Sequence, residues 1–160
     1  MNKIYLDDFY QRVQENKEYD IFTLSLPMFL ITKNLQINSD SFYKSKYDLL
    51  HSDIDVLAAL YFTNLEHSLT PTELYDATIF SSGGMTKVLK KLEEKNLIKR
   101  DISKIDKRKT LVTLTEKGAI LIEDCVKNVS LKLKDSFLVL SQKEQKELSK
   151  LLSKLIYSMI

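Results

Sequence analysis

Hydrophobic residues recur every three or four positions along most of this chain, the spacing of helices with one buried face. A weak pattern of this kind covers residues 3–18. Residues 20–38 are apolar on nearly every side, which predicts a helix covered from more than one direction. Residues 39–51 predict a polar connector with aromatic side chains, and a new helix begins at Ser52, whose hydroxyl can cap it.

Capping residues predict where the next helices begin. Thr70 is followed by Pro71 and Glu73, which predicts an N-cap, a proline in the first turn and a closed capping box. Ser82 starts another helix that extends to about Lys95. The inward stripe of that helix consists of Met85, Val88, Leu89 and Leu92.

Two β-branched segments, 98–102 and 109–114, lie on either side of a charged loop and predict a hairpin. Thr115 can then cap a further helix, and Ser141 with Glu144 predicts a capping box at the start of the last one. A short capped helix, a second helix and a hairpin in this order are typical of a winged helix-turn-helix. The expected fold class is therefore mainly α with a small β-hairpin wing.

Composition excludes several other classes of protein. The chain has 160 residues, one cysteine and two histidines, so an intrachain disulfide cannot form and a closed Cys/His zinc site is not expected. The most apolar run, residues 21–31, is too short to cross a membrane and contains Pro27, and the N-terminal residues lack signal-peptide features. We therefore expect a cytoplasmic protein with no membrane partner.

No motif predicts an enzyme. The stretch SSGGMTK (81–87) has some likeness to a phosphate-binding loop, but it lacks the G-x-x-x-x-G-K spacing and follows a helix, not a strand. There is no G-x-S-x-G elbow or other paired catalytic motif. The sequence therefore indicates neither catalysis nor a cofactor.

The net charge of +2 conceals an uneven distribution. Residues 87–109 hold ten basic and four acidic side chains, a net charge of +6, while the rest of the chain carries −4. Such a run is often only a solvated helix face. Here it falls on the outward face of the helix at 82–95 and on the adjoining hairpin, where a helix can enter the DNA major groove and a basic wing can reach the neighbouring minor groove or backbone.

Four stretches resemble the MarR family of bacterial winged helix-turn-helix regulators. SSGGMTKVLKKLEEKNLIKR (81–100) is similar to that family's recognition helix and the start of its wing. DKR (106–108) is similar to the wing motif, LTEKG (114–118) to the entry into the next helix, and DVLAAL (55–60) to an earlier helix. Asn96 stands where many members have glycine, although asparagine also adopts the left-handed conformation.

This resemblance implies that the helix at 82–95 lines the major groove and that Arg108 borders the minor groove, with Asp106 orienting its guanidinium. A simpler role for Asp106 is to stabilise the turn, and both roles are compatible. Lysines on the outward face and the hairpin are expected to contact phosphate more than bases. The expected DNA-binding residues are Ser82, Gly83, Thr86, Lys87, Lys90, Lys91, Lys104, Asp106, Lys107 and Arg108.

The helix at 20–38 and the last helix both carry more apolar surface than one core can use, which favours an interface between copies. The resemblance implies the same: N- and C-terminal helices of two chains interlock and hold two DNA-reading heads on a pseudo-palindromic operator. The expected divisions are an N-terminal dimerisation helix and connector (1–51), a DNA-binding domain (52–115) and C-terminal helices that complete the dimerisation region (116–160).

The remaining candidate residues have two interpretations each. Cys125 lies on an inward helix face, where packing is expected and a redox switch is the alternative. Tyr43, Tyr47 and His51 can line a pocket for the small aromatic or lipophilic effector that the resemblance implies, or can simply cover the dimer core. His67, like His51, is expected to be a surface or capping group.

The predicted function is that of a sequence-specific regulator of transcription, acting as a repressor on double-stranded DNA and responsive to an effector. Two alternatives remain open at this point. One is a winged-helix module whose basic face docks an acidic protein; the other is an architectural protein that binds duplex DNA with little preference for sequence.

Overall fold

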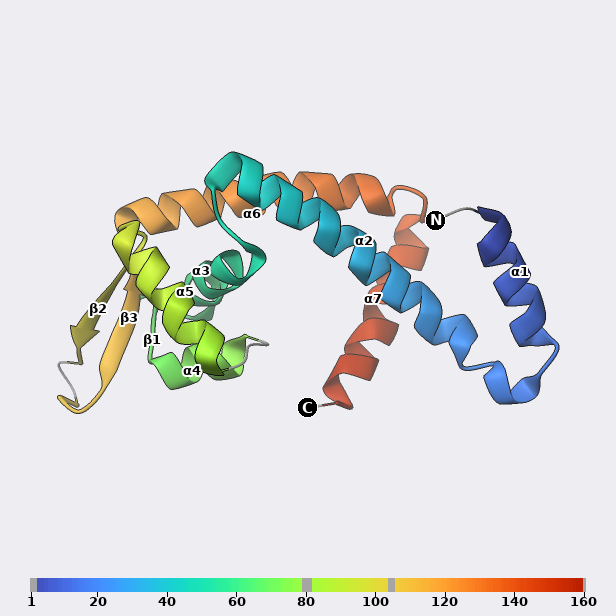
Figure 1. The fold of residues 1–160 in the computed structure, drawn as a ribbon, viewed down its shortest axis with the longest axis horizontal. Helices are drawn as coiled ribbons and strands as arrows, with labels where there is room; N and C mark the ends of the chain where they lie inside the picture. Colours follow the sequence, from blue (N-terminus) through green and yellow to red (C-terminus); the bar gives the residue numbers. More distant parts are fainter. Residues whose placement is uncertain (1–2, 79–81, 104–105, 160) are drawn as a thin grey trace. The chain divides into compact units, whose positions relative to one another are not determined.

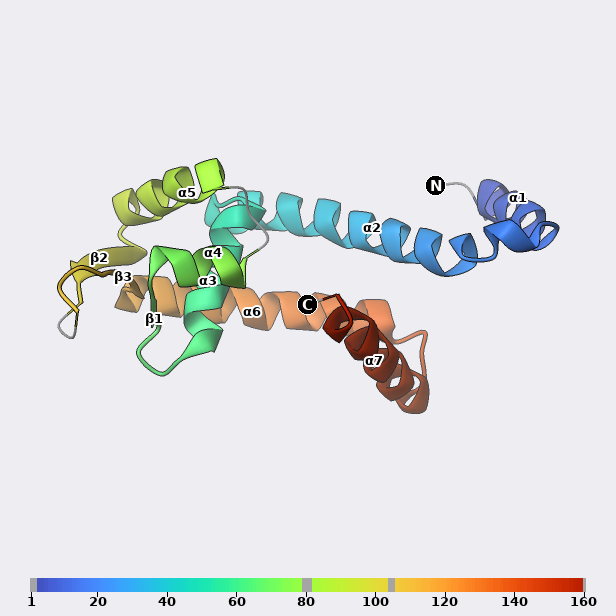
Figure 2. The same cartoon turned by 90° about the horizontal axis from the view of Figure 1, so that it is seen from below.

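A computed structural model describes residues 3–78, 82–103 and 106–159, which are mainly helical with one small sheet (Figures 1 and 2). The chain divides into two units, Met1–His51 and Ser52–Ile160, each considered on its own. The mainly α fold with a small β wing is confirmed. None of the helices described is long and apolar enough to cross a membrane.

The first unit contains α1 (Lys3–Gln14), the short 3-10 helix η1 (Lys17–Tyr19) and α2 (Phe22–Tyr47). The connector expected over residues 39–51 is wrong, because α2 continues through most of it. That stretch is polar but contains neither glycine nor proline, so nothing in it interrupts the helix. The helix ends at Asp48, which adopts a left-handed conformation with a φ of 52°.

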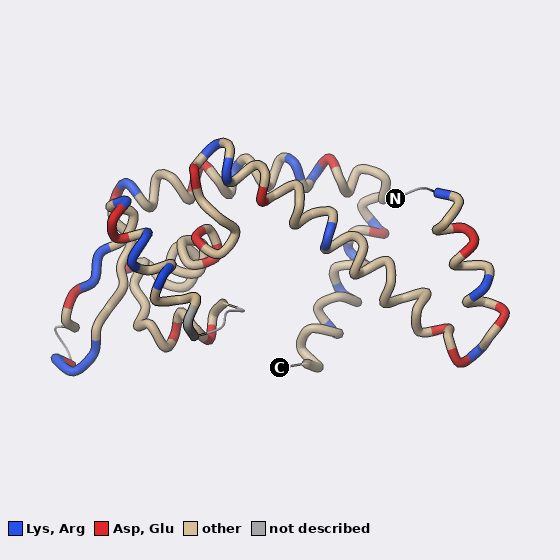
Figure 3. The backbone as a smooth tube through the Cα atoms, viewed as in Figure 1, with Lys and Arg blue, Asp and Glu red and all other residues tan. Residues whose placement is uncertain are grey.

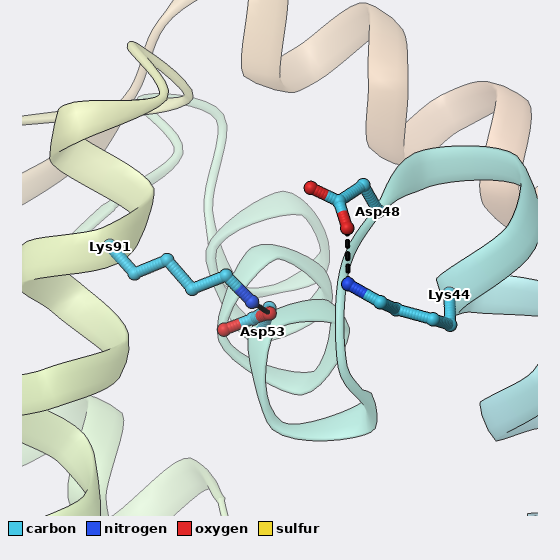
Figure 4. A network of polar contacts seen from close by, with 4 residues as sticks. All are labelled: Lys44, Asp48, Asp53 and Lys91. Atoms are coloured by element: carbon cyan, nitrogen blue, oxygen red, sulfur yellow. Dashed lines mark hydrogen bonds and ion pairs between the residues drawn. The ribbon is translucent and has the colours of Figure 1, made fainter.

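A contact between side chains one turn apart supports that helix end. The Lys44 ammonium lies against the Asp48 carboxylate at an i, i+4 spacing (Figure 4). A cation in the last turn also interacts favourably with the negative end of the helix dipole. The polar residues that predicted a connector are thus the ones that complete the helix.

The second unit contains α3 (His51–Thr63), α4 (Pro71–Ala77), α5 (Ser82–Glu94), α6 (Glu116–Phe137) and α7 (Gln142–Tyr157). Helix α3 begins at His51, so Ser52 lies inside its first turn and is not the predicted N-cap. Thr115 caps α6 as predicted, accepting a hydrogen bond from the Gly118 amide. The core residues that α3, α5 and α6 bury include Leu57, Leu60, Leu89, Leu92, Ile122 and Cys125.

Both predicted capping boxes are present. The Thr70 side chain accepts from the Glu73 amide, and the Glu73 carboxylate accepts from the Thr70 amide at 2.7 Å. Ser141 and Glu144 repeat the arrangement at the start of α7. Hydrogen bonds from Thr70 lower the pKa of Glu73, and those from Ser141 lower the pKa of Glu144. The ionised carboxylates are therefore the forms that stabilise these helix starts.

The sheet has three antiparallel strands, β1 (Ser68–Leu69), β2 (Ile98–Ile102) and β3 (Thr110–Leu114), in the order β1-β3-β2. Strands β2 and β3 form the predicted hairpin, with Ile98 opposite Leu114. Strand β1 was not predicted, because two residues carry no recognisable alternation. It joins β3 through the pairing of Ser68 with Thr113, whose hydroxyls lie 2.9 Å apart.

Candidate nucleic-acid interface

Helix α5 owes its orientation to its apolar stripe. Met85, Val88, Leu89 and Leu92 are buried, as predicted. The opposite face is consequently turned outward, and Thr86, Lys87 and Lys90 are exposed on it. Figure 3 shows basic residues following one another along α5 and again along the wing, the segment formed by β2, β3 and their connecting loop.

The two ends of α5 are defined differently. The backbones of Ser82 and Gly83 form its first turn. At its other end Asn96 has a φ of 57°, the left-handed conformation expected there. The Leu97 amide donates to the Leu92 carbonyl and the Asn96 amide to the Glu93 carbonyl, each at 2.9 Å. Together these bonds form a Schellman motif, which satisfies the last carbonyls of the helix and turns the chain into β2.

The start of α6 is fastened to this same helix end. The Thr115 hydroxyl donates to the Asn96 carbonyl at 2.8 Å, and the Lys117 ammonium donates to the Lys95 carbonyl at 2.9 Å. Gly118 also lies directly against the backbone at Leu97. Because α6 follows β3 directly in the chain, these contacts connect the end of α5, the wing and the start of α6. We call this set of contacts the joint.

The wing tip is organised by Asp106. Its carboxylate accepts from the Arg108 amide at 3.1 Å and lies 3.4 Å from the Arg108 Nε, so it both closes the turn and contacts the guanidinium. The Asp106 amide donates to the Ser103 hydroxyl, which is buried. The Arg108 side chain is 92% exposed, so it extends into solvent from an ordered base. Lys107 is exposed beside it, and Lys104 lies outside the described residues.

Internal ion pairs divide the basic side chains into two groups. Arg100 donates to Glu93 through Nε at 3.0 Å and Nη2 at 2.5 Å, and Lys99 lies 3.0 Å from Asp101. The ion pair of Lys90 with Glu94 is longer, at 3.9 Å, and both side chains are well exposed. Within the ranges that the structure describes, Lys87 and Lys107 form no ion pair. The cations best able to meet a phosphate are therefore a subset of the ten.

Lys91 differs from what the helix period predicted. It was expected on the outward face, but its ammonium turns toward α3 and contacts the carboxylate of Asp53 (Figure 4). Asp53 was not singled out in the sequence. The available signal was its position at the start of a strongly apolar stretch that includes Ile54, Val56 and Leu57, where a carboxylate needs a partner.

The three residues expected near an effector fall into two groups, all within the first unit. Tyr43 is 6% exposed, and its ring meets the His51 ring edge-on with centroids 5.5 Å apart. His51 also lies 3.1 Å from the Asp40 carboxylate. Tyr47 instead packs edge-on against Phe42 and lies under the Lys46 ammonium. Tyr43 and His51 are thus brought together, and Tyr47 contacts other partners.

The described residues offer little for other chemistry. No cluster of three or more His, Cys, Asp and Glu side chains that could hold a metal occurs among them. Cys125 is buried, as the packing prediction required. His67 stacks on Tyr61 with ring centroids 5.2 Å apart, and its carbonyl accepts from the Leu114 amide. What the arrangement presents is an exposed cationic helix beside a cationic wing.

Comparison with known proteins gives a consistent result. The family model described as "Transcriptional regulator SarA/Rot" matches residues 39–125. The regulator MgrA of Staphylococcus aureus is 30% identical over 129 residues, which are 78% of this chain and 84% of MgrA. The organic hydroperoxide resistance transcriptional regulator of Bacillus subtilis is 34% identical over 84 residues. That match covers 52% of this chain and only 57% of the relative, so the chain spans less than two thirds of that protein.

Solved structures share the fold. Wild-type apo MarR from Escherichia coli superposes with a TM-score of 0.69 at 26% identity, covering 82% of this chain and 96% of MarR. MepR from Staphylococcus aureus, solved as a complex with DNA, has a TM-score of 0.74 at 23% identity and covers 87% of this chain and 99% of MepR. The MepR likeness concerns the fold alone.

Proposed function

Because this chain belongs to the SarA/Rot family of transcriptional regulators, which have the MarR-type winged helix, we propose that it binds double-stranded DNA as a homodimer and represses transcription from a pseudo-palindromic operator. The observation that carries the proposal is the exposed cationic face of α5 beside the cationic wing, on which Arg108 is exposed and contacts Asp106. A cationic helix of this width fits the major groove of B-DNA.

In this proposal α5 enters the major groove with Thr86, Lys87 and Lys90 toward the DNA. The amides of its first turn, at Ser82 and Gly83, approach a phosphate, which the positive end of a helix dipole favours. Arg108, held by Asp106, reaches the minor groove, where a narrow and electronegative channel suits a guanidinium. The wing lysines Lys104 and Lys107 bind the backbone.

The proposed dimer rests on apolar surface that each unit leaves uncovered. On α7 the exposed apolar side chains are Leu151, Leu152, Leu155, Ile156 and Tyr157. On α2 they are Phe22, Leu24, Met28, Phe29, Ile31 and Ile37. Large apolar patches seldom stay in contact with water. A second copy would cover them and supply the second half-site reader, so residues 1–51 and 116–160 serve dimerisation and 52–115 DNA binding.

Regulation by a small molecule is part of the same proposal. An aromatic or lipophilic effector would bind near Tyr43, Tyr47 and His51, where the half-buried rings of Tyr47 and His51 offer stacking surface together with a polar nitrogen. An effector that favours a spacing of the two DNA-binding domains that does not fit the operator would weaken operator binding, because both half-sites must be contacted at once. The protein would act in the bacterial cytoplasm, on the nucleoid.

The test is a salt titration of DNA binding. Fluorescence anisotropy would compare a duplex with the inverted repeat from the protein's own promoter region with a shuffled duplex, from 50 to 300 mM salt. We expect log Kd to rise linearly with log salt concentration and the operator to bind at least about 1,000-fold more tightly. Equal affinities would favour an architectural binder, and no salt-dependent binding would favour a protein-docking module.

A further inference from the structure

A buried carboxylate on α3 is paired with a lysine of helix α5. Asp53, in the first turn of α3, has only 1% of its side chain exposed. Its neighbours Ile54, Val56 and Leu57 are buried as well, so the carboxylate is next to apolar groups. A buried ionised carboxylate is strongly unfavourable without a cation and hydrogen bonds. The ammonium of Lys91, from the last turn of α5, supplies a cation and a hydrogen bond (Figure 4).

Lys91 is set apart from the other lysines of α5 by its exposure. Its side chain is 33% exposed, whereas that of Lys90 is 73% exposed and Lys87 is exposed too. If the Lys91 ammonium moved to a DNA phosphate, the Asp53 carboxylate would lose this cation while remaining buried. Removing one partner of a buried ion pair is strongly destabilising. Pairing with Asp53 therefore competes with phosphate contact, and the burial of Asp53 favours the pair.

The pair also adds a constraint that packing alone does not provide. The stripe of Met85, Val88, Leu89 and Leu92 holds α5 against the core, but apolar contacts are non-directional and allow small rotations and shifts. A charge-assisted hydrogen bond has a narrow range of length and direction. Joining one point on α5 to one point on α3 fixes the rotation of α5 about its own axis.

We propose that Lys91 is a positioning residue and not a phosphate contact: through Asp53 it fixes the rotation of α5 on α3, and so directs Thr86, Lys87 and Lys90 toward the groove. This inference rests on the proposed function, because it assigns a role within the same DNA-binding face. It removes Lys91 from the expected contacts and adds Asp53, a residue too buried to touch DNA, to those that determine binding.

The salt dependence of binding separates the two roles of a lysine. A lysine that contacts phosphate releases a counterion, and its removal lowers the slope of log Kd against log salt by about one per half-site, or about two for a dimer. We expect K90Q to show this loss. K91M, which keeps the alkyl stem, should weaken binding about tenfold at every salt concentration with the slope unchanged. A slope that falls in K91M as it does in K90Q would overturn the proposal.

Substitution of Asp53 gives an effect of opposite sign under the two roles. If Asp53 positions α5 through Lys91, D53N should weaken operator binding about tenfold without changing the salt slope. If Asp53 merely withholds Lys91 from DNA, D53N should free the lysine, tighten binding and steepen the slope. K91R retains a cation that can pair with Asp53, so we expect it to bind within about threefold of the wild type. Tighter binding by D53N, or a K91R as weak as K91M, would contradict the proposal.

Thermal unfolding tests the pair without DNA. We expect D53N and K91M each to lower Tm by several degrees, and the double variant to lower it by clearly less than the sum of the two, because the groups lose one shared interaction. Additive losses would overturn the inference.

A wild-type protein that failed to bind duplex DNA would refute the proposed function, but the coupling between Asp53 and Lys91 could still be measured by thermal unfolding. A D53N that did not fold would leave K91M and K91R, which preserve the buried carboxylate, to decide.

Discussion

The carbonyl oxygen of Leu97 occupies the space that a side chain at position 118 would need. A Cβ on Gly118 would lie 2.0 Å from that oxygen and 3.3 Å from a methyl of Leu114. Gly118 does not have a positive φ, so glycine is required here for space and not for backbone conformation. The first turn of α6 can therefore approach the end of α5 closely enough for Thr115 and Lys117 to bond its carbonyls.

We expect Gly118→Ala to lower the free energy of unfolding by about 1–3 kcal/mol, because the added methyl must push a backbone carbonyl aside. Urea denaturation followed by circular dichroism would measure this. Ile120→Ala, an exposed position on the same helix, is the matched control and should change stability by no more than about 0.5 kcal/mol. Equal stability of Gly118→Ala and the wild type would mean that the backbone at Leu97 can move away from the added methyl with little loss of free energy.

Lys87→Ala and Arg108→Ala should each weaken operator binding roughly tenfold and lower its salt dependence, since each removes an exposed cation from the proposed interface. Lys143→Ala, which removes an exposed lysine at the start of α7, serves as the control of equal charge and should bind normally. Electrophoretic mobility shifts with the operator duplex would compare them. Normal binding by both test variants would refute the assignment of the grooves.

Asp106→Ala should weaken operator binding less than Arg108→Ala does, because the arginine keeps its charge but loses the acceptor that holds it. The double variant should bind no more weakly than Arg108→Ala alone. Such non-additivity identifies two residues that act through one interaction. Isothermal titration with the operator gives the three affinities, and independent, additive losses would indicate that Asp106 acts only on the turn.

The capping boxes make stability depend on pH in a defined direction. Hydrogen bonds from Ser141 lower the pKa of Glu144 in the folded chain, so its stabilising contribution is present above the unfolded pKa and is lost as pH falls through the folded one. We therefore expect the stability difference between the wild type and Glu144→Ala to be largest at neutral pH and to shrink below about pH 4.5. Urea denaturation at pH 7 and pH 3.5 would measure it, with Glu147→Ala as a control on the same helix.

Dimerisation should depend on the exposed apolar face of α7. Leu155→Asp puts a charge where Leu155 and Ile156 offer apolar surface, and we expect it to weaken self-association at least tenfold in sedimentation equilibrium. Circular dichroism should remain unchanged, because about half of each of these two residues is already exposed to solvent within one chain. Lys154→Ala is the neighbouring control. A wild-type protein that sediments as a monomer at micromolar concentration would refute the proposed dimer.

Local signals predicted the fold well where a residue acts on its own backbone. Thr70, Thr115 and Ser141 cap helices as predicted, and Asn96 turns the chain out of α5 as a helix end requires. Prediction failed at residues 39–47, where polar composition was interpreted as a loop although nothing in it breaks a helix. Strand β1 exists only because β3 is available to pair with it, and no local pattern can reveal such a partner.

The sequence was sufficient to locate the cationic surface of the candidate site, but not to assign a separate role to each of its lysines. Counting charges along the chain located the cationic segment, and helical period indicated which face of α5 it occupies. Lys91 precedes the inward-facing Leu92, so its angle on the helix was compatible with either direction. What decided it was Asp53, which lies 38 positions earlier in the chain, and only the packing of α5 on α3 brings the two together.

The strand order β1-β3-β2 has a consequence for how this unit folds. The β2–β3 hairpin closes a short loop, so it can form early and locally. Strand β1 pairs with the far edge of β3, and Ser68 meets Thr113 across 45 positions, which include α4, α5 and the wing. We expect this two-residue strand to join the sheet last during folding. Its pairing with β3 should also open first in the folded protein, so amide hydrogens protected by that pairing should exchange faster than those between β2 and β3.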